Sequence, residues 1–491
     1  MHEDILALRE QSKFSNKKLV SKKLSAHGGI REDLIKLRDR IRGFSKEINR
    51  TNETEDRQKT TTLIINFCEW LSSSGVVVGM RPTDLESNWF GEIKECLLEV
   101  KKIADQIPEV STGTGSLLMC LGVLESIERN HASAIRYYKE IKAGHPSYAM
   151  ARECMVRELF MSDRYKESVD LAAKLCSNFS NKYSIGTVAL SYPSIGDRQA
   201  KIRDAVGFLT STGFKVQIGD LTYKSLGYKT GSIEERVRDF TSILLDEEVN
   251  LILNTTGGFN SNEILEFIPW AKIIDLSNKT LIGYSDITAI NLALLSKTKI
   301  KSVDGMMLVD FYDDPAAFLH LFHVLENHPR ELFNYPFTWE DSNNDSFYYQ
   351  GPILTLDGKG SHASGRVLAG NQSTLNLMLG TPFMPKFEGS ILFIEYDKEE
   401  QTSLPSVERM LWQIRHAGIF DKIKGLVFGT LQPSVIDEET INWGLIDILE
   451  SVTSGYNFPV LYNAQFGHMY PSWSLENNSH VEITGNRVAL K

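Results

Sequence analysis

The spacing of apolar residues in the first 180 residues is typical of helices. After Glu32 they return at steps of three and four, at Leu34, Leu37, Ile41, Phe44 and Ile48. Steps of this size place the side chains on one face of a helix. Because the regular pattern covers only about two heptads, we predict a packed amphipathic helix rather than a coiled coil.

A weak internal repeat follows in the same region. Segments 130–146 and 163–179 align when one is shifted so that Ala134 meets Ser168. Small residues followed four positions later by bulky ones favour close packing of helix pairs, and the period resembles that of tetratricopeptide repeats. A plain helical bundle explains the pattern equally well. Both interpretations predict a helical accessory domain over 1–180 that serves as a scaffold or binds a protein partner, and that contains no catalytic constellation.

From Tyr183 onward, buried apolar runs alternate with amphipathic helices. The predicted strands are YSIGTVALSYP, FKVQIG, NLILNTTGG and KTLIGYS, with helices at DRQAKIRDAVGFLTSTG, SIEERVRDFTSILLD and SNEILEFIPW. Alternation of this kind predicts a parallel sheet covered on both faces. We therefore expect a Rossmann-like α/β domain over 181–335, with its functional site beyond the carboxyl ends of the strands.

The pattern changes again after a loop-rich, aromatic connector at about 310–350. Shorter strands follow at GRVLAG, GSILFIEY, KGLVFGT and HVEITGNRVAL, with one helix at SVERMLWQIRHAG. These elements predict a smaller, β-rich α/β domain over 336–491. The expected fold class is thus α/β, with a helical-repeat-like all-α domain in front of it.

Composition and charge narrow the possible partners. The net charge is −10 and hydrophobic residues make up 42%, so a nucleic acid partner is not expected, because phosphate binding needs a basic surface. No apolar run is long enough to span a membrane. The first residues lack the apolar core of a secretory signal, and five cysteines without a CxxC pair fit a reducing compartment. We expect a cytoplasmic location.

Two segments offer catalytic chemistry in the first α/β domain. In LIGYSDIT an apolar strand runs into Ser285 and a helix leaves at once, which exposes the hydroxyl and aims helix N–H groups at a developing oxyanion. Ser285 as an ordinary helix N-cap is an equally good interpretation. One strand earlier, Gly257 and Gly258 allow backbone to approach a ligand, although a tight strand–helix turn would also use them.

A serine nucleophile needs a base and an orienting carboxylate. Among eleven histidines, His468 lies between a strand and a proline turn, beside a glycine. Glu395 ends an otherwise apolar strand, where an acid is unfavourable unless it has a partner. His320 and His323 are spaced as metal ligands could be, but no carboxylate motif accompanies them. We therefore expect neither a metal nor a cofactor.

From about residue 183 to 491 the chain resembles the serine LD-carboxypeptidase family, which includes muramoyl-tetrapeptide carboxypeptidases and microcin C self-immunity peptidases. The matching segments, in the family's order, are TTGGFNSNEIL, LIGYSDIT, DGMM, GRVLAGNQSTLNLMLGTP, ILFIEY, SVERMLWQIRHAGIFDKIKGLVFGT and PVLYNAQFGH. The resemblance implies Ser285 as nucleophile, His468 as base and Glu395 as the acidic triad member. It also implies a backbone oxyanion hole at Gly258 and Asp286, with Gly257 beside the substrate, and a homodimer.

Two segments depart from the family's pattern. After His468 the family runs into a Leu-Pro-x-Gly-like turn, whereas this chain reads Trp473 to Asn478 as WSLENN. The helical segment 1–180 is not part of the family's usual architecture. The connector YPFTWEDSNND looks more like the microcin-immunity branch, where Trp339 could stack on a base; Trp339 could equally pack the connector alone.

The sequence thus predicts a serine hydrolase that cleaves either murein tetrapeptide or a peptidyl-nucleotide of the microcin C type. The alternative function is an inactive pseudo-hydrolase that senses a ligand or acts as an interaction scaffold through residues 1–180. Labelling by a serine-directed phosphonate distinguishes the two, because only a reactive serine forms the adduct.

Overall fold

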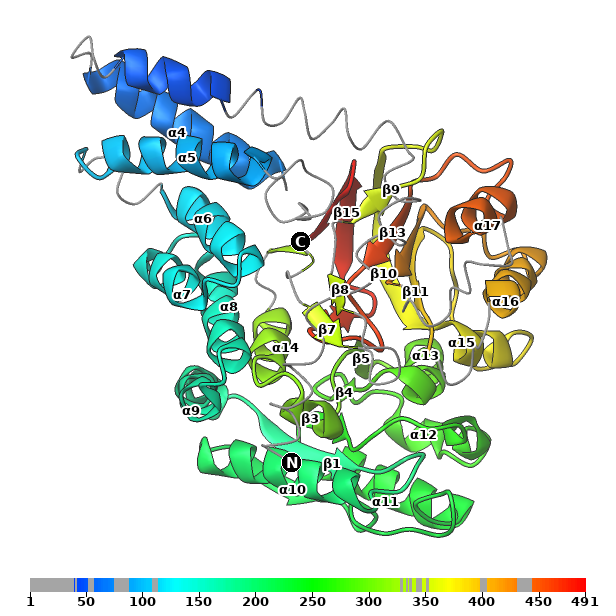
Figure 1. Cartoon of the computed structure of the whole chain (residues 1–491). Helices are drawn as coiled ribbons and strands as arrows, with labels where there is room; N and C mark the ends of the chain where they lie inside the picture. The colour runs from blue at the N-terminus through cyan, green and yellow to red at the C-terminus, as the bar shows by residue number, and fades with distance from the viewer. Residues whose placement is uncertain are drawn as a thin grey trace. The chain divides into compact units, whose positions relative to one another are not determined.

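The computed structural model describes residues 39, 42–51, 57–74, 88–107, 114–326, 330–332, 334, 338–340, 347–349, 353–397, 404–430 and 444–491. They fall into two compact units (Figure 1). One comprises Met1–Glu158 with Asn334–Pro352, and the other Leu159–Phe333 with Ile353–Lys491. The domain boundaries expected from the sequence, after residues 180 and 335, stay predictions.

The first unit is helical, as its apolar spacing predicts. Its helices include α4 (Arg57–Ser74), α5 (Asn88–Ala104), α6 (Gly115–Ile127), α7 (His131–Glu140) and α8 (Tyr148–Met161), the last of which continues into the second unit. Helices α6 and α7 approach closely at Gly122, where a Cβ atom would lie 2.3 Å from the ring of Tyr138. A similarity to tetratricopeptide repeats stays a prediction. The unit also contains a two-stranded sheet of β7 (Thr338–Glu340) and β8 (Phe347–Tyr349).

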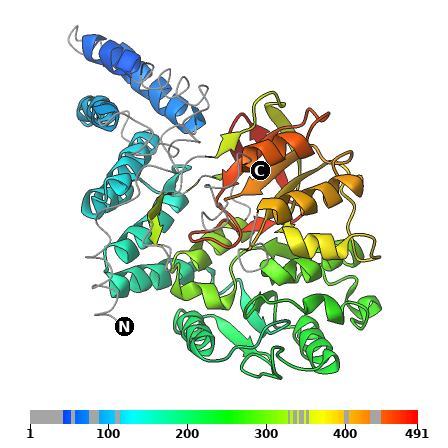
Figure 2. The same cartoon turned by 45° about the vertical axis from the view of Figure 1, so that its right-hand side comes forward.

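The second unit contains two sheets. The first has the strand order β14-β5-β4-β3-β1-β2, and all its pairings are parallel except that of β14. Its strands are β1 (Ser184–Val188), β2 (Lys215–Ile218), β3 (Leu251–Asn254), β4 (Thr280–Ile282), β5 (Lys301–Asp304) and β14 (Leu475–Glu476). Helices α10 (Asp197–Ser211), α11 (Ile233–Leu245) and α13 (Thr288–Lys297) accompany it (Figures 1 and 2). All of β3 and all but the first residue of β1 are buried, and the parallel pairings confirm the parallel-sheet prediction.

The second sheet has the order β6-β16-β15-β10-β11-β12-β13-β9. Its parallel centre consists of β10 (His362–Asn371), β11 (Ser390–Glu395), β12 (Gly425–Gly429) and β13 (Val460–Ala464). Antiparallel strands complete it: β6 (Arg330–Leu332), β9 (Leu354–Thr355), β15 (His480–Thr484) and β16 (Arg487–Leu490). Helices α15 (Gln372–Met378), α16 (Leu404–His416) and α17 (Leu445–Val452) accompany it. The expected β-rich α/β fold is confirmed.

The two sheets are joined by the segment that departs from the family's pattern. Strand β14 follows His468 in the chain, yet it pairs with β5 of the first sheet, with Leu475 opposite Asp304. Trp473, just before it, is buried and stacks on Phe466 with ring centroids 6.2 Å apart. The unusual turn is therefore packed, and it connects the histidine loop to the sheet that carries Ser285.

Two local predictions were wrong. The expected helix at SNEILEFIPW is divided into a 3-10 turn, η4 (Ser261–Ile264), and the short α12 (Trp270–Ile273). Pro269 explains the break, because proline has no N–H and disfavours helical backbone at the residue before it. The connector, expected to be loop-rich from about 310, contains η6 (Leu308–Tyr312) and α14 (Ala317–Leu325), which buries most of its residues.

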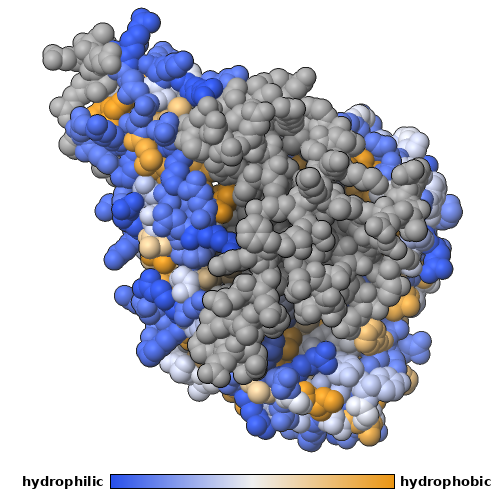
Figure 3. Space-filling view, viewed as in Figure 1, coloured by the Kyte–Doolittle hydropathy of each residue, from blue (hydrophilic) through white to orange (hydrophobic). Residues whose placement is uncertain are grey.

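Hydrophilic residues dominate the described part of the surface shown in Figure 3, and apolar residues form small separate groups there. Scattered apolar residues of this kind are usual on a protein surface. Over the described ranges, no helix has the length and apolar character needed to cross a membrane.

Candidate active site

Ser285 lies where β4 gives way to a helix. After β4 ends at Ile282, Ser285 opens the 3-10 turn η5 (Ser285–Ile287), which leads directly into α13. Its φ angle is +61°, a conformation that side-chain-bearing residues adopt rarely and at a cost. Its hydroxyl contacts His468 rather than capping the helix. A strained turn that points a serine out of a strand–helix junction is typical of a nucleophile elbow.

The three predicted triad side chains meet in one hydrogen-bonded chain. His468 Nε2 lies 2.9 Å from Ser285 Oγ, and His468 Nδ1 lies 2.7 Å from Glu395 Oε2. The His468 backbone N–H also donates to Glu395 Oε2, at 3.2 Å. Glu395 is 2% exposed, so its unpaired charge would be costly and its hydrogen bonds hold it in place. These contacts let the imidazole relay a proton away from the hydroxyl.

Gly467 makes room for the carboxylate. Its φ angle is +86°, and a Cβ atom there would lie 2.2 Å from Glu395 Cγ and 2.3 Å from Oε2. Real Cβ atoms essentially never approach other atoms that closely. Only glycine therefore allows the histidine loop to bring its backbone against Glu395.

Two further polar residues of the site were missed by the sequence analysis. Asn371 pairs with Glu395 across β10 and β11, and its Nδ2 donates to Glu395 Oε1 at 3.1 Å. Asp397 Oδ2 lies 3.5 Å from His468 Nε2, on the side of the ring that faces Ser285. Asp397 could have been predicted from its position two residues after Glu395, because side chains two residues apart point to the same side of a strand. Asn371 could be found only once the strand register was known.

The paired glycines lie beside the nucleophile. A Cβ atom on Gly257 would come within 3.0 Å of Ser285 Oγ, and one on Gly258, where φ is +148°, within 2.2 Å of Ser191 Oγ. Glycine is thus required for backbone to pass this close to the hydroxyl. Gly257 thus lies against Ser285, and Gly258 lies against Ser191, whose hydroxyl donates to Asp286; the role of Gly258 and Asp286 as an oxyanion hole stays a prediction.

The Asp286 carboxylate anchors the glycine loop. Its Oδ2 accepts hydrogen bonds from Ser191 Oγ at 2.5 Å and from the backbone N–H groups of Asn260 at 3.0 Å and Ser261 at 2.8 Å. Burial raises the pKa of Asp286, and the hydrogen bonds that it accepts partly oppose that shift. The residue after the nucleophile thus fixes the loop that follows Gly258.

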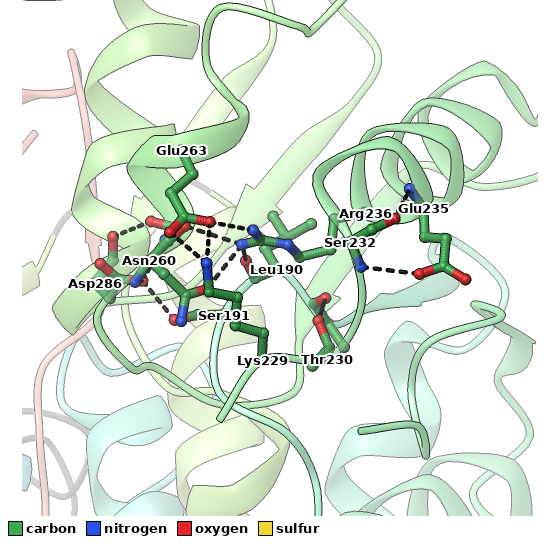
Figure 4. A network of polar contacts seen from close by, with 12 residues as sticks. Leu190, Ser191, Lys229, Thr230, Ser232, Glu235, Arg236, Asn260, Glu263 and Asp286 are labelled. Carbon is green, nitrogen blue, oxygen red and sulfur yellow. Dashed lines mark hydrogen bonds and ion pairs between the residues drawn. The ribbon is translucent and has the colours of Figure 1, made fainter. Parts of the chain in front are cut away.

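A buried arginine supports the same loop from the other side (Figure 4). Arg236, in α11, is 0% exposed, and its Nη1 donates to the carbonyl oxygens of Leu190 and Asn260 and to Asn260 Oδ1. Its Nη2 contacts Glu263 Oε2 at 2.6 Å, and Lys229 binds the same carboxylate. The two terminal nitrogens of Arg236 thus tie the loop at Asn260 and Glu263 to α11 through charge-assisted hydrogen bonds.

Asp304 adds a further carboxyl close to the triad. It ends β5, is 1% exposed, and no described residue donates to its carboxyl oxygens. Burial and the nearby Glu395 charge raise its pKa well above the ordinary value. A neutral acid at this position avoids a second buried charge beside Glu395.

The sequence also drew attention to a histidine pair with metal-like spacing and to Trp339. The described residues contain no group of three histidine, cysteine, aspartate or glutamate side chains able to hold a metal ion. Of the two histidines with metal-like spacing, His320 accepts a hydrogen bond from the Ser474 N–H at 3.0 Å. Trp339 lies in β7 opposite Tyr348, and its side chain is outside the described part of the structure. Its contact with a substrate stays a prediction.

Comparison with known proteins identifies the family. Models of the LD-carboxypeptidase N-terminal and C-terminal domains match residues 185–305 and 364–483. The chain is 30% identical over 298 residues to the putative carboxypeptidase YocD of Bacillus subtilis, which covers 57% of this chain and 86% of that protein. It is 27% identical over 335 residues to the microcin C7 self-immunity protein MccF of Escherichia coli, covering 61% and 93%.

Solved structures agree with these matches. MccF in complex with aspartyl sulfamoyl adenosine has a TM-score of 0.55 at 26% identity, covering 63% of this chain and 96% of that one. Among the sequence relatives, the probable murein peptide carboxypeptidase of Bacillus subtilis is 28% identical, and the match covers 58% of this chain and 85% of that protein. The helical region before residue 185 lies outside both domain matches. From Ile185 onward the chain belongs to the LD-carboxypeptidase family, and it is a serine peptidase.

Proposed function

We propose that the chain hydrolyses an amide bond with Ser285 as nucleophile, His468 as general base and acid, and Glu395 as the orienting carboxylate. The observation that carries this proposal is the unbroken contact chain from Ser285 Oγ through His468 to Glu395, with distances of 2.9 and 2.7 Å. Hydrogen-bond distances of this size are those required for proton transfer between a serine and its base.

The reaction begins when His468 Nε2 takes the proton of Ser285 Oγ as the oxygen attacks the carbonyl carbon. Glu395 holds the Nδ1 proton and stabilises the imidazolium that forms. The developing oxyanion faces the backbone N–H groups of Gly258 and Asp286. His468 then gives its proton to the leaving amine, and an acyl group remains on Ser285.

Water completes the cycle. His468 removes a proton from a water molecule, the resulting hydroxide attacks the acyl carbon, and the proton returns to Ser285 as the acid product leaves. The Glu395 orientation matters in both halves, because the imidazole must keep the same tautomer and ring position. Asn371, which holds the second oxygen of Glu395 at 3.1 Å, supports that orientation.

The substrate that we propose is an amino acid or short peptide joined through an amide to a nucleotide. The match to MccF, the microcin C7 self-immunity protein, extends over 93% of the length of MccF. The solved structures of MccF include a complex with aspartyl sulfamoyl adenosine. A murein tetrapeptide is the second candidate, favoured by the similar identity to the probable murein peptide carboxypeptidase. Further parts of the proposal are a cytoplasmic homodimer and a protein partner for residues 1–180.

Incubation of the full chain with both candidate substrates, analysed by mass spectrometry, tests this proposal. We expect cleavage by the wild type, loss of cleavage in Ser285→Ala, and normal cleavage in Ser211→Ala, whose hydroxyl lies at the exposed end of α10. Cleavage that survives in Ser285→Ala would refute the assignment of the nucleophile. A well-folded wild type that fails to cleave either substrate and resists serine-directed phosphonates would favour the pseudo-hydrolase.

A further inference from the structure

One buried carboxylate connects the two catalytic loops. Asp310 Oδ1 accepts hydrogen bonds from the phenol groups of Tyr284, at 3.2 Å, and Tyr470, at 2.7 Å. Its other oxygen accepts the backbone N–H of Met307 at 2.6 Å. Asp310 itself is 1% exposed and lies in the 3-10 helix η6. Both oxygens of the Asp310 carboxylate thus accept hydrogen bonds, one from the two phenols and the other from the backbone.

The two phenols belong to the loops that carry the triad. Tyr284 directly precedes Ser285, and Tyr470 lies two residues after His468. The Tyr284 ring also contacts the His468 imidazole edge-on, with centroids 5.0 Å apart. The first loop lies within the N-terminal family domain and the second within the C-terminal one, whereas Asp310 lies between the two matched ranges. One carboxylate therefore bridges the two catalytic loops, in addition to the direct contact between Ser285 and His468.

We propose that Asp310 is a positioning residue that keeps Ser285 and His468 at hydrogen-bonding distance by binding Tyr284 and Tyr470. This role rests on the proposed function, because it presumes that the two residues react together. Small errors in their separation are costly, since a displacement of about 1 Å can lower a rate roughly a hundredfold. Ordinary packing would not need both phenols to share one carboxylate oxygen.

An amide cannot accept all three of these hydrogen bonds. Asp310 accepts three hydrogen bonds on two oxygens, whereas asparagine has one acceptor oxygen and an NH₂ group. In Asp310→Asn the NH₂ group must face either the Met307 N–H or the two phenols. The substitution keeps the size of the side chain, so it tests the hydrogen bonds rather than the volume.

The first readout is the rate at which a fluorophosphonate labels Ser285 in the full chain, because it reports nucleophile reactivity without a known substrate. We expect Asp310→Asn to lower this rate by about tenfold to a hundredfold. Tyr284→Phe and Tyr470→Phe should each lower it as well, but should have little further effect in the Asp310→Asn background, because coupled residues are not additive. Asp239→Asn is the matched control, since Asp239 is also buried and accepts two backbone N–H groups, far along the chain in α11.

The second readout is hydrogen exchange in peptides that contain residues 284–286 and 467–470. If Asp310 holds both loops, Asp310→Asn accelerates exchange in both by about tenfold, the change expected for one lost charge-assisted hydrogen bond. Faster exchange in one loop alone, or an unchanged labelling rate, would overturn the proposal. If Asp310→Asn does not fold, Tyr470→Phe, which removes a single hydroxyl, takes its place.

The two proposals can fail separately. If the wild type is not labelled, the proposed function falls, and hydrogen exchange alone then decides whether Asp310 holds the two loops. If the wild type is labelled at Ser285 but Asp310→Asn is labelled as fast, the triad stands and the positioning role of Asp310 is wrong.

Discussion

Gly467→Ala offers a sharp test of the geometry at the catalytic carboxylate. A Cβ atom at this position would lie 2.2 Å from Glu395 Cγ, 2.3 Å from Oε2 and 2.4 Å from Cδ. Ordinary van der Waals contact begins at 3.4 Å, so Glu395 and the histidine loop must separate by more than 1 Å (3.4 − 2.2 = 1.2). A shift of that size breaks the 2.7 Å contact between Glu395 and His468.

The substitution should lower both the stability and the activity of the protein. Alanine at a φ angle of +86° costs about 1–2 kcal/mol of folding free energy. The displacement of the carboxylate should lower kcat/KM about a hundredfold, because the imidazole loses its orientation. Stability and activity therefore change for different reasons and can be measured separately.

Gly455 provides a matched control in the same unit. Its φ angle is +85°, and a Cβ atom there would meet nothing within 4 Å. Gly455→Ala should lose only the backbone cost of about 1–2 kcal/mol in urea denaturation, less than Gly467→Ala, and should keep its hydrolysis rate. The reasoning is refuted if Gly467→Ala is as active as Gly455→Ala.

Three further predictions follow from the buried carboxylates. Glu395→Gln should lower kcat by roughly a thousandfold or more, because an amide cannot hold the required tautomer of His468; near-normal turnover in steady-state assays would contradict this. Asp286→Ala removes the acceptor of three hydrogen bonds and should cost about 3 kcal/mol or more of unfolding free energy, whereas Asp286→Asn, which keeps one oxygen there, should cost clearly less. Burial raises the pKa of Asp310 from 3.8 to about 6, so the folded protein binds this proton more tightly than the unfolded chain. The stability that the protonated group contributes is therefore lost as the pH rises from about 4 to 6. Between pH 4 and pH 7, urea denaturation should show that the wild type loses roughly 3 kcal/mol of unfolding free energy relative to Asp310→Asn. A difference between the two proteins that does not change with pH would refute this.

Local sequence patterns were sufficient for the fold class, whereas the roles of the candidate triad also needed the family resemblance. Each of Ser285, Glu395 and His468 ends a strand or lies in the loop after one, and parallel strands place such positions on one edge of their sheet. The alternating apolar runs predicted β1, β3, β4 and β11 for the same reason. The sequence therefore predicted where each of these residues lies along its own strand or loop.

Residues whose partners lie on distant elements could not be predicted in this way. Asn371 reaches Glu395 because β10 pairs with β11 in one register, and Asp310 meets Tyr284 and Tyr470, which lie 26 and 160 residues away along the chain. The pairing of β14 with β5 likewise depends on how the two sheets pack. The helix expected across Pro269 was wrong because the apolar spacing outweighed a local signal that should have ended it.

Mapping the adduct of a fluorophosphonate by mass spectrometry tests the central claim most directly. We predict that the folded wild type carries the phosphonyl group on Ser285 and that His468→Ala carries it far more slowly. A folded wild type whose Ser285 remains unmodified, or a His468→Ala variant that reacts as fast as the wild type, would contradict the assignment of these residues as nucleophile and base.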